Sequence, residues 1–259
     1  MLRVARGILL RPSFSTASTS KPLKPPTLLL SEVFASVQGE GPFTGRPSVF
    51  TRLGVCNLSC AWCDTPYTWL FDRDRHRKVA ARAGPHAQPR IYDKRTELTR
   101  TTTDHLFRDV RALAGEGIRA VVITGGEPLL QKKHLQAFVT RLIDDGFAIE
   151  FETNGTVSPE GLPRGVHLNV SPKLENSMQP VEQRIKLQVL KECLAWPNSV
   201  LKFVVGEHRD LDEVCGIVEQ LDIPSHRVFL MPLGTVCICG SAVPLVEITG
   251  LSIESQSSF

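Results

Sequence analysis

Three closely spaced cysteines are the residues of this sequence best suited to chemistry. Cys56, Cys60 and Cys63 follow a C-x3-C-x2-C spacing. They can give one metal centre three thiolate ligands, whereas a closed structural zinc site takes four protein ligands. A [4Fe–4S] cluster held by three thiolates keeps an open coordination position on its fourth iron, where another molecule can bind. The spacing therefore favours a reactive iron–sulfur cluster.

Two alternatives stay open for these cysteines at this point. Zinc could be held if a distant fourth ligand joined them, and His76, Cys237 and Cys239 are the candidates. Alternatively, the three could be buried thiols, because a free cysteine packs in a protein core as a small apolar side chain. Cys237 and Cys239 have no other ligand-type residue near them, so we expect both to be incidental.

The segments around the cysteines indicate where an active site would lie. A β-prone run at residues 48–53 leads into the cysteine loop, and an apolar run at 120–124 leads into Gly-Gly-Glu-Pro at 125–128. Polar residues also follow later apolar runs, at 152–156 and 171–173. Paired glycines let the backbone approach a ligand closely, and proline suits the first turn of a helix. Barrel active sites gather at the carboxyl ends of the strands, so we expect these segments to meet.

Strand-like and helix-like segments alternate along the chain, which predicts an α/β fold with a parallel sheet. The expected helices include residues 132–144 and 210–221. The six expected strands lie near residues 48–54, 119–124, 147–153, 166–170, 200–206 and 227–231. With 259 residues, of which 42% are hydrophobic, the chain can bury one sizeable core, so we expect a single domain.

Seven ordered segments together resemble a known family. They are residues 37–41, Arg52, and residues 56–65, 124–130, 152–156, 171–173 and 201–205. In this order they resemble the 7-carboxy-7-deazaguanine synthase family of the radical S-adenosylmethionine superfamily, over residues 30–235. The resemblance implies a partial (β/α)6 barrel of the radical S-adenosylmethionine type, open on one side for a substrate.

The resemblance also assigns roles to residues in these segments. Cys56, Cys60 and Cys63 would hold the [4Fe–4S] cluster, and Thr65 would help to coordinate Mg²⁺, which prefers oxygen ligands. The residues implied to cradle S-adenosylmethionine are Trp62, Cys63, Asp64, Gly126, Ser171, Pro172 and Lys173. The residues implied to contact the substrate are Val37, Gln38, Gly39, Glu40, Arg52 and Thr124.

The implied substrate is 6-carboxy-5,6,7,8-tetrahydropterin. Its heterocycle edge suits Gln38 and Glu40, and its carboxylate suits the planar fork of Arg52. A radical derived from the cofactor would abstract a hydrogen atom, and ring contraction with loss of ammonia would give 7-carboxy-7-deazaguanine. The reaction is that of a carbon–nitrogen lyase in queuosine-type biosynthesis. The expected partners are an electron donor of the flavodoxin or ferredoxin type and a second copy of the chain in a homodimer.

Two further functions stay open. Another radical S-adenosylmethionine enzyme, such as an activase that makes a glycyl radical on a partner protein, would share the cysteine motif. Residues 38–41 and Thr65 fit a small pterin and Mg²⁺ better. A non-catalytic iron–sulfur protein is the other alternative, because residues 236–259 form an atypical tail where the family has a segment that closes over the substrate.

Three regions differ in composition from the expected barrel. Residues 1–29 contain five basic residues, no acid and a run rich in serine and threonine, which is typical of a transit peptide. We expect delivery to mitochondria, with plastid or cytoplasm as alternatives. Residues 72–100 are charged and irregular, and we expect a solvated surface insertion there. Residues 236–259 are the atypical tail.

The charge balance excludes some partners. The chain has 30 basic and 27 acidic residues, a net charge of +3, and leaving out the five basic residues of the leader gives −2. A nearly neutral body gives no support for direct nucleic-acid binding. No apolar stretch is long enough to span a bilayer, so we expect no membrane insertion.

Overall fold

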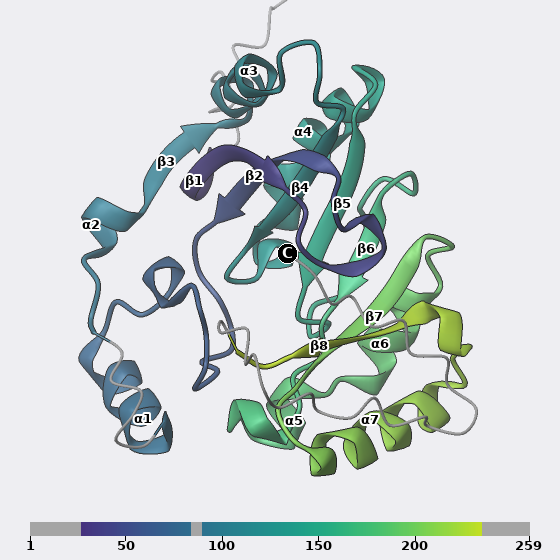
Figure 1. Ribbon diagram of the computed structural model, residues 1–259. Coiled ribbons are helices and arrows are strands. Elements are labelled where there is room, and N and C mark those ends of the chain that lie inside the picture. The colour runs from purple at the N-terminus through teal and green to yellow at the C-terminus, as the bar shows by residue number, and fades with distance from the viewer. Residues whose placement is uncertain (1–26, 84–89, 235–259) are drawn as a thin grey trace, which may run out of the picture.

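One sheet organises the chain in this computed structural model, which describes residues 27–83 and 90–234. Within these residues the sheet has eight strands in the order β3-β1-β2-β4-β5-β6-β7-β8 (Figure 1). The strands are β1 (Thr27–Val37), β2 (Pro47–Leu53), β3 (Thr99–Thr102), β4 (Ala120–Gly125), β5 (Ala148–Thr153), β6 (His167–Val170), β7 (Ser199–Val205) and β8 (Val228–Pro232).

Strands β2 and β4 to β8 confirm the expected α/β architecture. Each pairs with its neighbour in parallel, in the order β2-β4-β5-β6-β7-β8. These are the six strands expected from the apolar runs of the sequence. They form an open sheet of the partial (β/α)6 barrel type, so that all six carboxyl ends lie along one edge.

Helices follow most of the parallel strands. The α-helices are α1 (Arg73–Ala83), α2 (Lys94–Glu97), α3 (Thr103–Ala114), α4 (Lys132–Asp144), α5 (Val181–Arg184), α6 (Leu187–Leu194) and α7 (His208–Leu221). Short 3-10 helices are η1 (Gly41–Phe43), η2 (Pro66–Thr68), η3 (Pro128–Gln131), η4 (Glu175–Ser177) and η5 (Ser225–Arg227). Residues 154–166, which connect β5 to β6, contain no helix, so this unit departs from strict alternation.

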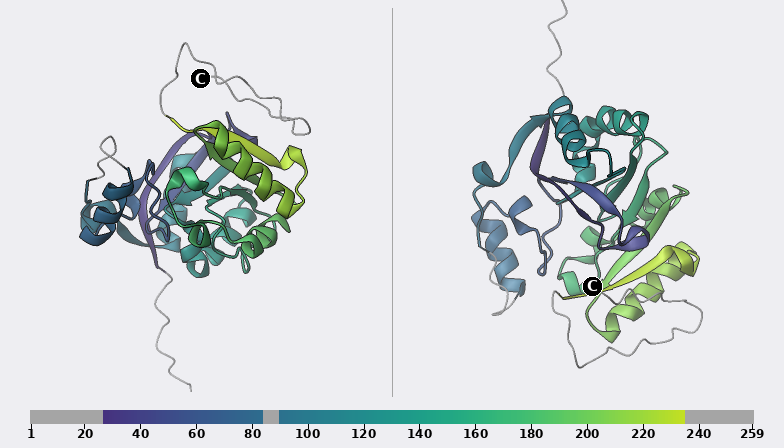
Figure 2. Two further views of the ribbon diagram at one scale, coloured as in Figure 1. Left: turned by 90° about the horizontal axis from the view of Figure 1, so that it is seen from below. Right: turned by 45° about the horizontal axis from the view of Figure 1, so that its top comes forward.

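The hydrophobic core lies between the sheet and helices α3, α4 and α7, which cover one side of it (Figure 2). Alternate residues of a strand point to opposite faces. In β4, Val121 and Ile123 are fully buried in this core, whereas Thr124 lines a cavity on the other face. In β5, Phe151 likewise lies in the core and Glu152 lines the cavity. The sheet therefore has an apolar face under the helices and a polar face toward the cavity.

The sequence analysis did not predict two of the strands, β1 and β3. β1 pairs antiparallel with both β2 and β3, so these strands extend the parallel sheet at one edge. Leu28 in β1 is fully buried. The expected leader of residues 1–29 is therefore wrong at its boundary, because the folded body begins by Thr27.

The expected irregular insertion at residues 72–100 is also wrong in part. Residues 73–83 form the regular helix α1, and β3 joins the sheet from Thr99. Val79 of α1 packs with Trp69 and Leu70 in a small second core. The segment is charged as expected, but it has a fixed place beside the cysteine loop.

Several expectations fall on residues outside the described ranges. The atypical tail of residues 236–259, with Cys237 and Cys239, and most of the leader lie there. Among the helices of residues 27–83 and 90–234, none is both long and apolar enough to cross a membrane.

Candidate active site

A cavity of about 740 Å³ lies at the carboxyl ends of the parallel strands. It brings together the cysteine loop and the ends of β4, β5, β6, β7 and β8 with the segment after β1. Of the residues predicted for the site, those that line it are Val37, Gln38, Gly39, Glu40, Arg52, Cys56, Cys60, Trp62, Cys63, Asp64, Thr65, Thr124, Gly126, Ser171 and Lys173. Pro172 is the exception. This cavity confirms that the polar segments at the strand ends lie together, as the sequence predicted.

The cysteine loop is held in place by backbone contacts with the end of β4. Gly126 N donates to Leu53 O at 3.1 Å, and Glu127 N donates to Val55 O at 2.9 Å. A Cβ on Gly126 would lie 2.1 Å from Val55 O, so only glycine allows this approach. Val55 itself takes a left-handed conformation with φ 68°. The paired glycines therefore allow the cysteine loop to pack closely against the end of β4.

Burial of two thiols of the loop opposes formation of their thiolates. Burial raises the pKa of Cys56 to about 12 and that of Cys60 to about 11. Iron would supply the positive charge that displaces these protons, because a metal binds the deprotonated sulfur. The loop therefore suits a buried metal centre better than a reactive free thiol.

Hydrogen-bond donors are already directed at the sulfur atoms. Trp69 Nε1 donates to Cys63 Sγ at 3.2 Å, and Leu58 N donates to Cys56 Sγ at 3.4 Å. Such bonds tune the reduction potential of an iron–sulfur cluster. Within the described residues, no three side chains of ligand type converge on a point that one ion could occupy. A four-iron cluster binds each thiolate through a different iron, so its ligands do not need to converge.

Glu127 is a fully buried carboxylate with a structural role. Its oxygens accept hydrogen bonds from Leu129 N at 3.0 Å, Thr153 Oγ1 at 2.8 Å and Asn154 N at 2.7 Å. It thus ties the end of β5 to the turn after β4. Burial raises its pKa, and these donors counter part of that effect.

The residues predicted to cradle S-adenosylmethionine form one group beside the cysteines. Lys173 Nζ donates to Ser171 Oγ at 3.0 Å and lies 5.3 Å from the centroid of the Trp62 ring. Trp62 Nε1 donates to Asn176 Oδ1 at 3.1 Å, which fixes the ring. An ammonium, a hydroxyl and an aromatic face are therefore available to a polar, carboxylate-bearing ligand.

The carboxylate of Glu32 on β1 orients the side chain of Arg52. Its Nε donates to Glu32 Oε1 at 2.7 Å, and Tyr67 Oη donates to the same oxygen at 2.9 Å. Because this bond uses only Nε, the two Nη groups remain for a ligand in the cavity. Sequence reasoning missed Glu32, which lies on an antiparallel strand that it did not predict.

A row of polar side chains crosses the cavity face of the sheet. Gln38 Nε2 donates to Glu150 Oε1 at 3.1 Å and to Glu152 Oε1 at 3.2 Å. Thr124 Oγ1 donates to Glu152 Oε2 at 2.7 Å. Glu152 also lines the cavity, although the sequence did not predict a site role for it. A signal was available, because two acids occupy alternate positions of an otherwise apolar strand.

Glu40 forms an ion pair with Lys202, a buried lysine of β7. The Lys202 side chain is 9% exposed and that of Glu40 38% exposed. Lys202 lines the cavity and was not among the predicted site residues. The ion pair holds the segment after β1 over the far end of the sheet, and it sets the direction in which Glu40 faces the cavity.

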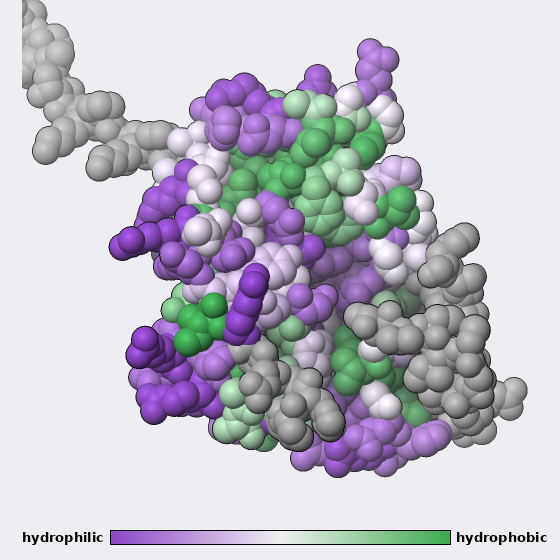
Figure 3. Space-filling view, turned by 60° about the vertical axis from the view of Figure 1, so that its left-hand side comes forward, coloured by the Kyte–Doolittle hydropathy of each residue, from purple (hydrophilic) through white to green (hydrophobic). Residues whose placement is uncertain are grey.

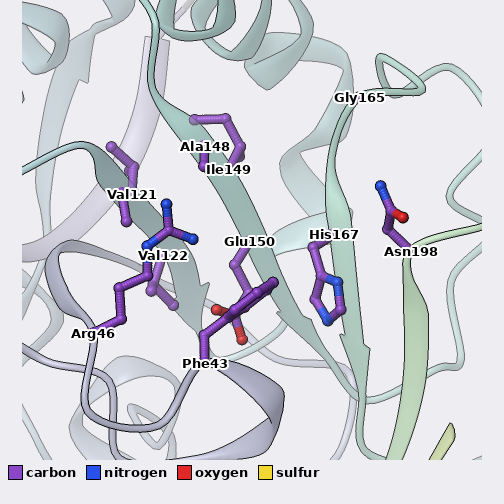
Figure 4. Close-up of a pocket in the computed structure, with 11 residues that line it drawn as sticks. Phe43, Arg46, Val121, Val122, Ala148, Ile149, Glu150, Gly165, His167 and Asn198 are labelled. Atoms are coloured by element: carbon purple, nitrogen blue, oxygen red, sulfur yellow. The ribbon is translucent and has the colours of Figure 1, made fainter.

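A second cavity, of about 260 Å³, lies at the amino-terminal ends of the strands (Figure 4). Phe43 and His167 meet there edge to face at 4.7 Å between ring centroids. Burial raises the pKa of Glu150 to about 7 and lowers that of His167 to about 4. None of the predicted site residues lines this cavity. It is separate from the cysteines, and Gln38 is linked to it through the side chain of Glu150 and the backbone of Arg46.

The fold and the cysteine site define the class of this protein. The family model described as the radical SAM superfamily matches residues 51–169, which include all three cysteines and the strands β4, β5 and most of β6. A solved structure described as QueE from Escherichia coli superposes with a TM-score of 0.60 and 30% sequence identity, covering 80% of this chain and 85% of that one.

Curated relatives identify the particular family. A 7-carboxy-7-deazaguanine synthase of Rhodopirellula baltica is 34% identical over 221 residues, covering 80% of this chain and 74% of the relative. One of Hyperthermus butylicus is 36% identical over 210 residues, covering 80% and 77%. The chain belongs to the 7-carboxy-7-deazaguanine synthase family.

Family membership implies a [4Fe–4S] cluster, S-adenosylmethionine and Mg²⁺ as cofactors. The residues fit them. Three cysteines on one loop provide the thiolates, with donors on two sulfur atoms. Thr65 Oγ1 lies 3.8 Å from Cys63 Sγ and lines the same cavity, so an oxygen ligand is available beside the cluster position. Family membership therefore supports a [4Fe–4S] cluster at these cysteines and not a zinc ion.

Proposed function

We propose that this protein converts 6-carboxy-5,6,7,8-tetrahydropterin into 7-carboxy-7-deazaguanine and ammonia. The atoms of the substrate are divided between these two products, and release of ammonia breaks a carbon–nitrogen bond, so the reaction is that of a carbon–nitrogen lyase. The observation that carries the proposal is that Gln38, Arg52 and Thr124 line the same cavity as the three cysteines. The reacting heterocycle would thus lie beside the cofactors.

The polar row of the cavity supports a flat heterocycle that carries a carboxylate. The free Nη groups of Arg52 would bind the carboxylate as a planar fork. Gln38, Thr124 and Glu152 would contact the ring edge, where donors and acceptors alternate. Glu40, held by Lys202, would close the remaining side of the ring.

The other predicted residues support cofactor binding. Cys56, Cys60 and Cys63 would hold the cluster, Thr65 would bind Mg²⁺, and Ser171 with Lys173 would contact S-adenosylmethionine. The backbone at Trp62, Asp64 and Gly126 would complete the cradle. Once bound, these cofactors supply radical hydrogen-atom chemistry, whereas the protein orients the reactants and limits the access of water.

The test is anaerobic reconstitution with iron and sulfide, followed by incubation with a reductant, S-adenosylmethionine, Mg²⁺ and the pterin. We expect brown [4Fe–4S] absorption and a product with the mass of 7-carboxy-7-deazaguanine. Cys60→Ala is expected to lose both. Cleavage of S-adenosylmethionine without conversion of the pterin would instead favour the activase or the non-catalytic alternative. Uptake of zinc without the cluster absorption would contradict the cluster assignment.

Three finer expectations remain predictions. They are an electron donor of the flavodoxin or ferredoxin type, a homodimer, and delivery to mitochondria directed by the N-terminal leader. The composition of residues 1–29 supports the last of these. A fluorescent fusion carrying residues 1–29 would test delivery, and sedimentation of the full chain would test the dimer.

A further inference from the structure

The cysteine loop has an outer side, which faces away from the substrate cavity. Helix α1 covers part of this side, and Met178 lies next to it. The proposed function, on which this inference rests, requires one electron to reach the cluster from outside the protein. The outer side of the loop is a surface from which a redox partner could deliver it.

Helix α1 is attached directly to the backbone of the cysteine loop. Arg75 Nη2 donates to Cys56 O at 2.9 Å and also to Leu58 O. Arg82 Nη2 donates to Ser59 O at 2.9 Å. The Arg75 guanidinium also lies 4.4 Å from the centroid of the Trp69 ring. The inner face of α1 is thus fixed against the loop that binds the cluster.

The outer face of the same helix is strongly basic. The eleven residues of α1 include five Arg or Lys and one acid, Asp74. Arg73, Arg77 and Lys78 are exposed, and Arg77 pairs with Asp74. Figure 3 brings this side of the molecule forward and shows hydrophilic residues gathered on its lower part. Because the chain without its leader has a net charge of −2, this concentration of positive charge is local.

An exposed apolar side chain, Met178, lies beside the basic helix. Met178 is 47% exposed, and Val181, three residues further along the chain, is 57% exposed. The Met178 carbonyl accepts a hydrogen bond from Arg82 Nη1 at 3.2 Å, which joins Met178 to α1. Ala61 N donates to Ser177 O at 3.1 Å, so this segment also borders the cysteine loop. Protein interfaces commonly combine an apolar centre with a charged rim.

We propose that this α1 face, formed by Arg73, Arg77, Lys78, Met178 and Val181, docks an acidic protein that carries one electron. The charge favours a negatively charged partner, because opposite potentials steer association and fix orientation. The partner's reduced flavin or iron–sulfur centre loses one electron, and the cluster on the other side of the loop gains it. No bond is made or broken in this step. Complexes that transfer electrons are commonly small and transient.

The test uses the reconstituted full chain and a charge-reversal variant, Arg73→Glu/Arg77→Glu/Lys78→Glu. The cluster reduction rate is measured by stopped flow, and the reduced cluster is confirmed by electron paramagnetic resonance, without pterin. Reduced acidic flavodoxin and dithionite serve as alternative reductants. The matched control is Arg108→Glu/Arg119→Glu/Lys133→Glu, three exposed basic residues away from α1.

We expect the α1 variant to lose at least tenfold in rate with flavodoxin and to keep the wild-type rate with dithionite. The control variant should keep both rates. High salt should slow the wild type with flavodoxin but should leave the α1 variant nearly unchanged. Met178→Glu should slow reduction by flavodoxin without any change in the basic residues, which provides a second test.

An α1 variant and a Met178→Glu variant that both keep the wild-type rate with flavodoxin would overturn the proposal. So would an equal loss with dithionite, because these residues would then belong to the cluster site itself. Failure of pterin conversion would not affect this readout, since cluster reduction is measured in its absence. The docking proposal and the proposed function can therefore fail separately.

Discussion

Substitution of Gly126 by alanine should separate the cysteine loop from the sheet. The added Cβ would lie 2.1 Å from Val55 O and 2.8 Å from Cys56 Cβ, whereas Cβ contacts below 3.0 Å essentially do not occur. The end of β4 and the loop must therefore move apart, and Cys56 moves with the loop. This predicts a loss of both stability and cluster binding.

The size of the effect follows from the contacts that the movement disrupts. Overpacking costs about 1–3 kcal/mol. The hydrogen bonds from Gly126 N to Leu53 O and from Glu127 N to Val55 O would weaken, at about 1 kcal/mol each. The total is about 3–5 kcal/mol. For a chain of this size, that corresponds to a fall of about 10 °C in Tm.

The assay is thermal unfolding by circular dichroism, with iron determined per chain after reconstitution. Gly117→Ala is the matched control, because its Cβ would meet nothing within 4 Å. We expect the control to change the free energy of unfolding by less than about 0.5 kcal/mol and to bind iron normally. Normal iron content and an unchanged Tm in Gly126→Ala would refute the steric reasoning.

Three further predictions concern Arg52 and Lys202, which line the active-site cavity, and Glu150, which lines the second cavity. Arg52→Ala should keep the cluster but raise the KM for the pterin at least tenfold, and an unchanged KM would reject Arg52 as the carboxylate ligand. Lys202→Met should raise the same KM by roughly tenfold through loss of the ion pair with Glu40, with substantial rescue by Lys202→Arg; equal KM values in both variants and wild type would contradict a positioning role. For Glu150, burial raises the pKa from 4.5 to about 7, so the folded state holds this proton more tightly than the unfolded state. The stability that this proton provides is complete below pH 4.5 and is lost as the pH rises through 7, by up to about 3 kcal/mol. Glu150→Gln should reduce this loss in urea titrations at pH 5 and pH 8, and an identical pH dependence in the two proteins would exclude Glu150 as its source.

The parallel part of the fold could be predicted from the sequence, because fully buried strands are continuous apolar runs. Residues 120–124 are one such run and became β4. β3 lacks this signal, since it reads Thr-Arg-Thr-Thr at the sheet edge and depends on pairing with β1. In β1 the apolar run is interrupted by Ser31 and Glu32. Helix α1 has only Val79 as a fully buried residue, so its apolar pattern is too weak to identify.

The candidate site could be predicted only where local spacing carries chemistry. The three cysteines are close in sequence, so their shared role was visible. Lys202 and Glu40 are 162 positions apart, and only the closure of the sheet places them in contact. The same holds for Arg75, whose bond to Cys56 O depends on where α1 packs. No composition or periodicity encodes these pairings.

The carboxamide of Gln38 has consequences for which ligands the cavity can select. Both of its hydrogens are already committed, one to Glu150 and one to Glu152, and its oxygen accepts from Glu40 N at 3.2 Å. An incoming molecule that accepts a bond from this amide must release a carboxylate, and must then offer a donor to that carboxylate. Binding is thus an exchange of partners, and a ligand edge that only accepts leaves the released carboxylate with one donor fewer, although Thr124 still donates to Glu152 and Asn169 to Glu150. Such an exchange rewards molecules that present a donor directly beside an acceptor, and it penalises analogues in which either group is removed.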